Sequence, residues 1–152
     1  MIVTLVLGTW ALAIGVYDLV RHRIPNLALL PVLVVAVLAL AVNGRGLLGV
    51  TPASSAAGFA LALALYLPGY ALGKMGAGDV KFAACLGLLL GWVHAAEMLL
   101  IAGVGVGVIS MVWIKFFGGD RKSRAPNGAA FAVAFCAELA GGPFLSVLEK
   151  WL

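Results

Sequence analysis

The sequence predicts an all-α, polytopic membrane protein with about six transmembrane helices in one domain, residues 1–152. Of these residues 64% are hydrophobic and 11% are charged, whereas soluble domains are about 45–50% apolar and about 25% charged. Apolar runs near the length of a membrane span recur along the chain, and short basic clusters separate them. We therefore expect the lipid bilayer as a partner and no nucleic acid.

The first half of the chain predicts three spans. The run Ile2 to Val20 has no basic residue before it, so it is expected to be a retained span, not a cleaved signal peptide. In Ile24-Pro25-Asn26 the proline keeps its predecessor extended, and Asn26 is placed to cap a second span from Leu27 to about Val42. Thr51-Pro52 pairs a capping hydroxyl with a proline at the first helical position, which starts a third span to about Leu72.

The second half predicts three more helices, the first of them short. Val80 to Val93 is too short to cross about 30 Å of hydrocarbon comfortably. The fifth span runs from Ala95 to about Phe117, and its glycines between Gly103 and Gly107 are expected to permit close helix packing. Pro126-Asn127-Gly128 opens a sixth span that ends near Leu148.

The basic residues predict the orientation. With the N-terminus outside, one side of the membrane collects Arg21, Arg23, Lys74, Lys81, Lys115, Arg121, Lys122 and Arg124. The other side receives only Arg45 and Lys150. Because basic loops stay in the cytoplasm, both termini are expected on the outer side.

Two acids fall at one membrane depth in this topology. Asp18 lies about one turn inside the cytoplasmic end of the first span, and Asp79 begins the short fourth helix. If that helix begins below the lipid headgroups, Asp79 lies at the same membrane depth as Asp18. Acids placed within a membrane are costly and usually functional, so the pair predicts the arrangement of an aspartic protease.

The chemistry needs two close carboxylates because they do not both ionise and so hold one shared proton. The ionised member takes a proton from an attacking water, and the protonated member donates to the peptide carbonyl oxygen. Gly76 and Gly78 suit this site because the backbone must approach closely and turn without a Cβ.

Each residue also has a simpler interpretation. A glycine-rich turn before a helix capped by Asp is common. Asp18 alone could be an acid whose side chain snorkels to the membrane surface and pairs with Arg21 or Arg23. Lys81 is either a membrane anchor or a charge that keeps Asp79 ionised.

The remaining polar groups leave alternatives open. Glu138 either bonds to a polar group on a neighbouring helix or lines the cavity, and Glu97 near the outer interface is solvated or paired. His22 is expected to be solvated. Cys85 and Cys136 lie in apolar runs without CxxC or zinc spacing, so they are expected to be small core residues, with no metal and no cofactor.

Three motifs in order resemble type IV prepilin peptidases. Tyr17-Asp18 with Arg23-Ile24-Pro25-Asn26 is similar to the first family motif. Gly76-Ala77-Gly78-Asp79-Val80-Lys81 with Ala84 and Gly87 is similar to the GxGDxK motif, and Ala125 to Ala130 to a third element, in which Asn127 replaces the usual aromatic residue. The resemblance runs from Tyr17 to Phe135.

The resemblance implies an aspartic endopeptidase that removes the basic leader of a prepilin or pseudopilin before its apolar N-terminal helix. Asp18 and Asp79 would be catalytic. Site-shaping roles would fall to Gly76, Gly78, Lys81, Arg23, Pro25 and Asn26. The family works in the bacterial cytoplasmic (inner) membrane, which would put both termini in the periplasm, and the substrate helix would enter laterally from the bilayer.

The chain is most similar to the short subfamily that serves tight-adherence (Flp-type) pili, because it has no insert with paired CxxC motifs and so no expected methyltransferase activity. Two other classes stay open. One is a small proton-coupled transporter in which Asp18, Asp79 and Glu138 form a relay, and the other is a structural subunit of a secretion or pilus machine. Presenilin-type proteases are a more distant alternative.

Overall fold

The computed structural model of the chain describes residues 1–21, 23–73, 75–117 and 127–142. All regular structure in these ranges is helical, which confirms the predicted class. The helices are α1 (Ile2–Arg21), α2 (Asn26–Asn43), α3 (Pro52–Ala71), α4 (Ala77–Leu90), α5 (Trp92–Phe117) and α6 (Asn127–Gly141). The prediction of about six helices with a short fourth is therefore confirmed.

Two predicted helix starts have different outcomes. The Thr51 hydroxyl accepts a hydrogen bond from the Ser54 N–H at 3.3 Å, and Pro52 is the first residue of α3, so this cap is confirmed. The capping role expected of Asn26 is wrong. Pro25, with extended backbone at φ −72° and ψ 132°, precedes α2 without any side-chain cap, and Asn26 is already helical. The Asn26 side chain is therefore available for another contact.

Three helices, α1, α2 and α3, are long and apolar enough to cross a membrane among the described residues. At 14 residues, α4 is about 21 Å long, so it is shorter than a full span. The sixth helix was expected to continue to about Leu148, but α6 ends at Gly141. Gly142 then takes the left-handed φ of +65° that commonly ends a helix, and the predicted continuation lies outside the described residues. The basic loop 120–124 and Lys74 also lie outside them.

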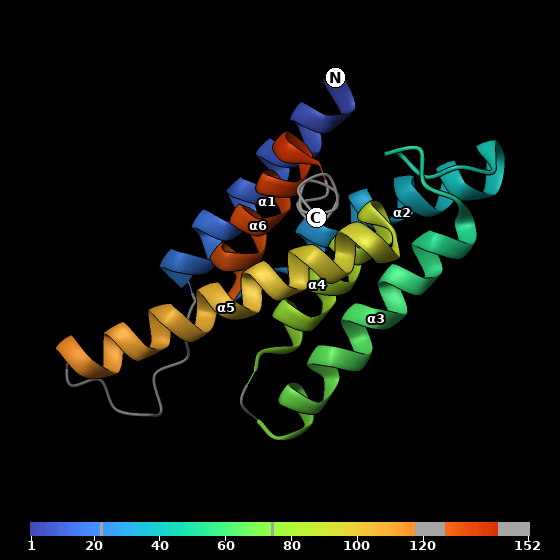
Figure 1. Ribbon diagram of the computed structural model, residues 1–152. Helices are drawn as coiled ribbons and strands as arrows, with labels where there is room; N and C mark the ends of the chain where they lie inside the picture. The colour runs from blue at the N-terminus through green and yellow to red at the C-terminus, as the bar shows by residue number, and fades with distance from the viewer. Residues whose placement is uncertain (22, 74, 118–126, 143–152) are drawn as a thin grey trace, which may run out of the picture.

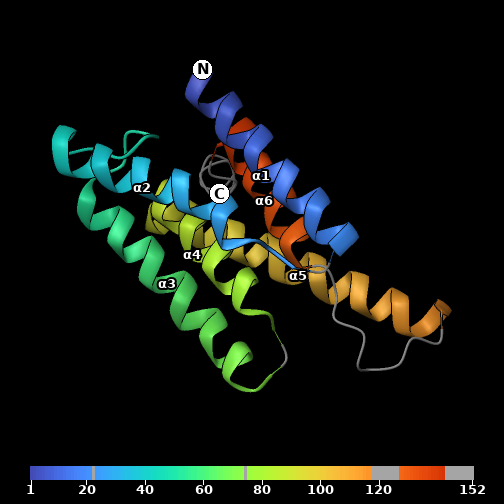
Figure 2. The ribbon, with the colours of Figure 1, turned by 180° about the vertical axis from the view of Figure 1, so that it is seen from behind.

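The helices form two closely packed pairs around a shared centre. In both views α1 lies beside α6 and α3 lies along α4 (Figures 1 and 2). Helix α5 crosses in front of α4 in Figure 1 and behind it in Figure 2. The short α4 is the most buried helix described, with Phe82, Ala83 and Leu86 entirely inaccessible to solvent. The edge of the Trp10 ring meets Phe82 with centroids 5.7 Å apart, which joins α1 to α4.

Small residues set the distances within both pairs. A Cβ on Gly58 of α3 would collide with the Gly87 carbonyl oxygen of α4, and the reverse holds for Gly87 and Gly58. In the other pair, a Cβ on Gly15 of α1 would lie 2.7 Å from the Ala132 Cβ of α6. Backbones approach this closely only where side chains are absent or small.

Among the described residues, the glycines of α5 have no packing partner of the kind expected. No described atom outside their own helix and chain neighbours lies within 4 Å of a Cβ built on Gly103, Gly105 or Gly107. Close helix packing instead uses glycines of α1, α3 and α4. The prediction missed this because glycine spacing alone does not say which face of a helix meets a neighbour.

Candidate active site

Asp18 is buried in the contact between α1 and α6. Only 3% of the residue is exposed, and its Oδ2 accepts a hydrogen bond from the Gly128 backbone N–H at 2.9 Å. Gly15, one turn earlier on α1, allows this approach because a Cβ there would meet Ala132 and Ala129 of α6. Arg21 is exposed, whereas Asp18 faces inward. Asp18 is therefore a buried acid at the contact between α1 and α6.

Asp79 is half-buried in the first turn of α4. Its Oδ2 accepts a hydrogen bond from the Asn127 side-chain amide nitrogen at 3.3 Å. The donor lies on α6, which starts at that residue. Asp79 is therefore held from outside its own helix.

The start of α6 brings the two aspartates to one place. Asn127 bonds to Asp79, and the next residue, Gly128, bonds to Asp18. Consecutive Cα atoms are about 3.8 Å apart, so carboxylates from α1 and α4 converge on a single turn of α6. The expectation that Asp18 and Asp79 come from different helices and share one level agrees with this geometry.

The glycine motif packs against the proline motif. A Cβ on Gly78 would lie 3.0 Å from the Ile24 Cβ and 3.1 Å from the Ile24 carbonyl oxygen. Gly78 therefore meets the expectation of a close backbone approach. Neither Gly76 nor Gly78 is among the glycines with positive φ, so the turn expected at these residues does not depend on a left-handed backbone. A Cβ on Gly76 would instead lie 3.4 Å from Asp79 Oδ2, so this glycine leaves the carboxylate uncovered.

Lys81 and Asn26 provide a second link between these motifs. The Lys81 ammonium donates to Asn26 Oδ1 at 3.2 Å. This contact joins α4 to the first residue of α2, next to Pro25. From the sequence, Lys81 was expected either to anchor the helix at the membrane surface or to keep Asp79 ionised. Its contact with Asn26 was not predicted. Arg23 is exposed beside this junction.

The arrangement offers two carboxylates with separate hydrogen-bond donors near the surface end of a short, buried helix. Two carboxylates share a proton and polarise a water molecule when they lie in close contact. In the part of the chain that the structure describes, no group of three or more His, Cys, Asp or Glu side chains has the geometry to hold a metal ion. The chemistry available from these side chains is acid–base chemistry by paired carboxylates.

The other buried acids form a separate cluster. Glu138 Oε2 lies 3.1 Å from His94 Nδ1 of α5, which confirms the alternative in which Glu138 bonds to a polar group on a neighbouring helix. Glu97 is within hydrogen-bonding reach of Glu138. Glu97 is 3% exposed, so it is paired, and the solvated alternative is wrong.

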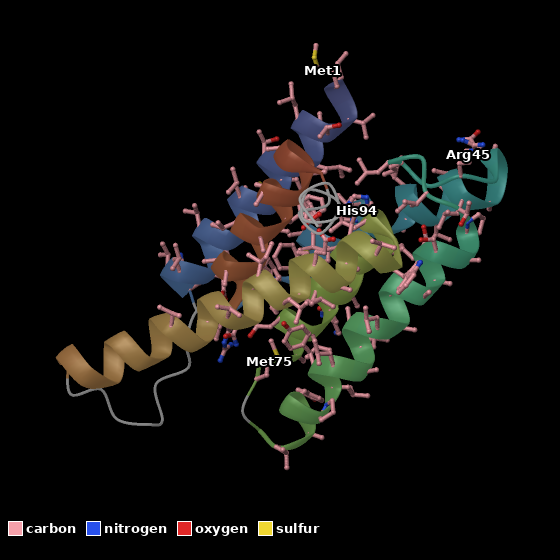
Figure 3. All side chains as sticks on the ribbon, viewed as in Figure 1. Met1, Arg45, Met75 and His94 are labelled. Atoms are coloured by element: carbon pink, nitrogen blue, oxygen red, sulfur yellow. The ribbon has the colours of Figure 1, made fainter. Side chains whose placement is uncertain are left out.

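Asn127 and Glu138 are eleven positions apart on α6, or about 16 Å along a helix. The structure therefore does not bring Glu138 together with the two aspartates. Figure 3 likewise shows His94 well away from Met75, which immediately precedes the glycine motif. This separation disfavours a relay that runs through Asp18, Asp79 and Glu138.

Two residues of the site escaped assignment from sequence. Asn127 and Gly128 were recognised only as the start of the last helix and as part of a third motif, with no role attached. The signal that could have found them is the Asn-Gly pair itself, which stands directly before the apolar run 129–137.

Comparisons with known proteins match this chain to one family. The type IV leader peptidase family matches residues 5–111, a range that contains both aspartates and ends before Asn127. A prepilin leader peptidase/N-methyltransferase of Legionella pneumophila is 32% identical over 60 residues, which are 40% of this chain and 21% of that protein. The match thus spans about a fifth of that relative. No solved structure matches.

Proposed function

The chain belongs to the type IV leader peptidase family, and on that basis we propose that it is a membrane-embedded aspartic endopeptidase with Asp18 and Asp79 as its catalytic pair. One observation carries the assignment of the pair. Asp18 and Asp79 accept hydrogen bonds from the consecutive residues Gly128 and Asn127. Two acids 61 positions apart in the sequence are thereby held at one turn of α6.

The proposed mechanism uses one proton shared by the pair. The ionised carboxylate accepts a proton from water as the water oxygen attacks the peptide carbonyl carbon. The protonated carboxylate donates to the carbonyl oxygen, which gives a neutral tetrahedral intermediate. In the collapse of that intermediate, the newly protonated carboxyl gives its proton to the amide nitrogen, and the ionised carboxylate accepts a proton from one hydroxyl group. The C–N bond breaks, the carboxylic acid and the amine leave, and the pair again holds one proton. In the structure, the Asn127 amide bonds to Asp79 and the Gly128 N–H bonds to Asp18.

The proposed substrate is the basic leader of a prepilin-like protein, cut before its apolar helix. The relative from Legionella pneumophila bears the name prepilin leader peptidase, which supports this substrate class. We assign this chain to the short Flp-type subfamily. Cleavage at the cytoplasmic face of the inner membrane, with both termini outside, agrees with basic residues Arg21, Arg23 and Lys81 near the site.

The test is cleavage of a co-expressed prepilin-like protein that carries a basic leader, a glycine and an apolar helix. Asp18→Asn and Asp79→Asn should each abolish leader removal, while the variant proteins still insert in the membrane. Glu138→Gln is the matched control, since it makes the same chemical change at a buried acid about 16 Å along the helix from the site. Normal cleavage by either aspartate variant would refute the proposal.

The same variants separate the alternative functions. A proton-coupled transporter that uses Glu138 would lose proton flux in liposomes with Glu138→Gln. A purely structural subunit would still support pilus assembly with both aspartates replaced. The peptidase proposal expects the opposite result in each case.

A further inference from the structure

We propose that Asn127 and Gly128 are positioning residues that hold the two catalytic carboxylates in register through the first turn of α6. The inference rests on the proposed peptidase function and adds to it residues that lie beyond the family match, which ends at residue 111. It starts from the two hydrogen bonds that meet at this turn.

The packing of the helices makes this turn the common support of the pair. Asp18 lies on α1, which packs closely along α6. Asp79 lies on α4, whose closest backbone contact is with α3 through Gly87 and Gly58. The contact of Trp10 with Phe82 also joins the two pairs, but it does not bond to either carboxylate. Asn127 joins the pairs at Asp79 itself, through a hydrogen bond from α6 to α4.

Asn127 contributes through its amide donor. A hydrogen bond from an amide to a carboxylate fixes the rotation of the carboxylate and favours its ionised form. Hydrogen bonds to charged groups contribute more than neutral ones. Since Asp79 is half-buried, its orientation depends on such neighbours. Asn127 therefore sets which Asp79 oxygen faces the reaction centre.

Gly128 contributes through its backbone and its missing side chain. Its N–H donates to Asp18 Oδ2 at 2.9 Å. A Cβ at this position would lie 2.8 Å from the same oxygen and 3.0 Å from the Asp18 Cβ and Cγ. Any larger residue would push the carboxylate or the helix start away, so glycine keeps Asp18 in contact with its donor.

A simpler role for Asn127 would be to start α6, because asparagine is favoured at helix starts. The two roles differ in what they affect. A helix-starting residue affects stability, and an exchange to a good helix former at the first helical position leaves catalysis intact. Loss of a positioning residue lowers the turnover rate of protein that is still folded, with substrate binding unchanged.

The experiment compares three variants of the full chain in detergent or nanodiscs, with a prepilin-like protein as substrate. Asn127→Leu keeps the approximate size and removes the amide, Asn127→Gln keeps an amide donor, and Val133→Ala is a control on the exposed face of α6. Asn127→Leu should lower kcat on the order of 10- to 100-fold. Its KM should stay within about two-fold of the parent, and thermal unfolding should show that the variant remains folded at the assay temperature.

Partial recovery of kcat by Asn127→Gln completes the expected result, with Val133→Ala equal to the parent. An unchanged kcat in Asn127→Leu would overturn the inference, and so would a loss that Asn127→Gln shares in full. The proposed function fails by a different outcome, namely cleavage by Asp18→Asn or Asp79→Asn. Gly128→Ala adds a check on the other carboxylate, and full activity in this variant would also contradict the inference.

Discussion

The Lys81 ammonium donates a hydrogen bond to Asn26 Oδ1 at 3.2 Å, across 55 positions of sequence. The contact joins the last residue of the GxGDxK motif to the last residue of the Ile-Pro-Asn motif. Together with the packing of Gly78 on Ile24, it ties the beginning of α4 to the beginning of α2. The two motifs therefore form one structural unit beside Asp79.

This contact predicts energetic coupling between the two side chains. Lys81→Met and Asn26→Ala should each lower thermal stability slightly, because both groups are exposed and water replaces part of the bond. Their double variant should show a coupling free energy of about 0.5–1 kcal/mol in a double-mutant cycle. Denaturation of the four proteins in detergent measures it. Strictly additive effects would show that the contact contributes nothing.

The two glycines of the motif should respond differently to alanine. Gly78→Ala should destabilise the protein by about 1–3 kcal/mol, because the new methyl group would meet the Ile24 backbone. Gly76→Ala should leave stability unchanged or slightly raised, since its φ of −76° suits alanine and its nearest contact is at 3.4 Å. Thermal unfolding of the pair is the measurement. Equal losses would contradict the assigned contact with Ile24.

The contact between α3 and α4 predicts the most severe glycine substitution. Gly58→Ala would place a methyl group against the Gly87 carbonyl oxygen, and backbone atoms cannot rotate away. We expect a loss of about 3 kcal/mol or more, seen as low yield or early melting. Gly103→Ala on α5 is the matched control, because no described atom outside its own helix and chain neighbours lies within 4 Å of the new Cβ, and alanine there should leave stability equal or higher. Tolerance of both changes would contradict the close helix contact.

The His94–Glu138 contact predicts a structural role separate from catalysis. Glu138→Leu would leave His94 without this partner and would remove a carboxylate that neighbours Glu97. We expect stability to change by about 1–3 kcal/mol, while leader cleavage per folded molecule stays within a few-fold of the parent. Parallel unfolding and cleavage assays check this. A loss of cleavage in fully folded protein would implicate the cluster in catalysis.

The predictions from sequence succeeded where the structural feature depends on residues within one short segment. Run length and hydropathy located the helices, and Thr51-Pro52 marked the start of α3 because a capping hydroxyl and a proline act within a few residues. Asn26 shows the limit of such local rules. It occurs at a helix start, as a cap would, but Pro25 takes that position and the Asn26 side chain bonds to Lys81 on another helix.

The glycines show the same limit. Gly103 to Gly107 have the spacing of a packing motif, yet they face open space among the described residues. Gly58 and Gly87 make the closest helix contact, although neither was predicted to do so. The spacing of glycines shows which face of a helix lacks side chains. Whether another helix packs against that face depends on the tertiary structure.

By itself the sequence determined the all-helical class, the short fourth helix and the choice of Asp18 and Asp79 as a candidate pair, because these follow from hydropathy, length and the cost of charge near lipid. Only the tertiary structure decided what holds the pair. The hydrogen bonds from Asn127 to Asp79 and from Gly128 to Asp18 join residues 48 and 110 positions apart. Contacts at such separations depend on how whole helices pack, and no local pattern of residues encodes that packing.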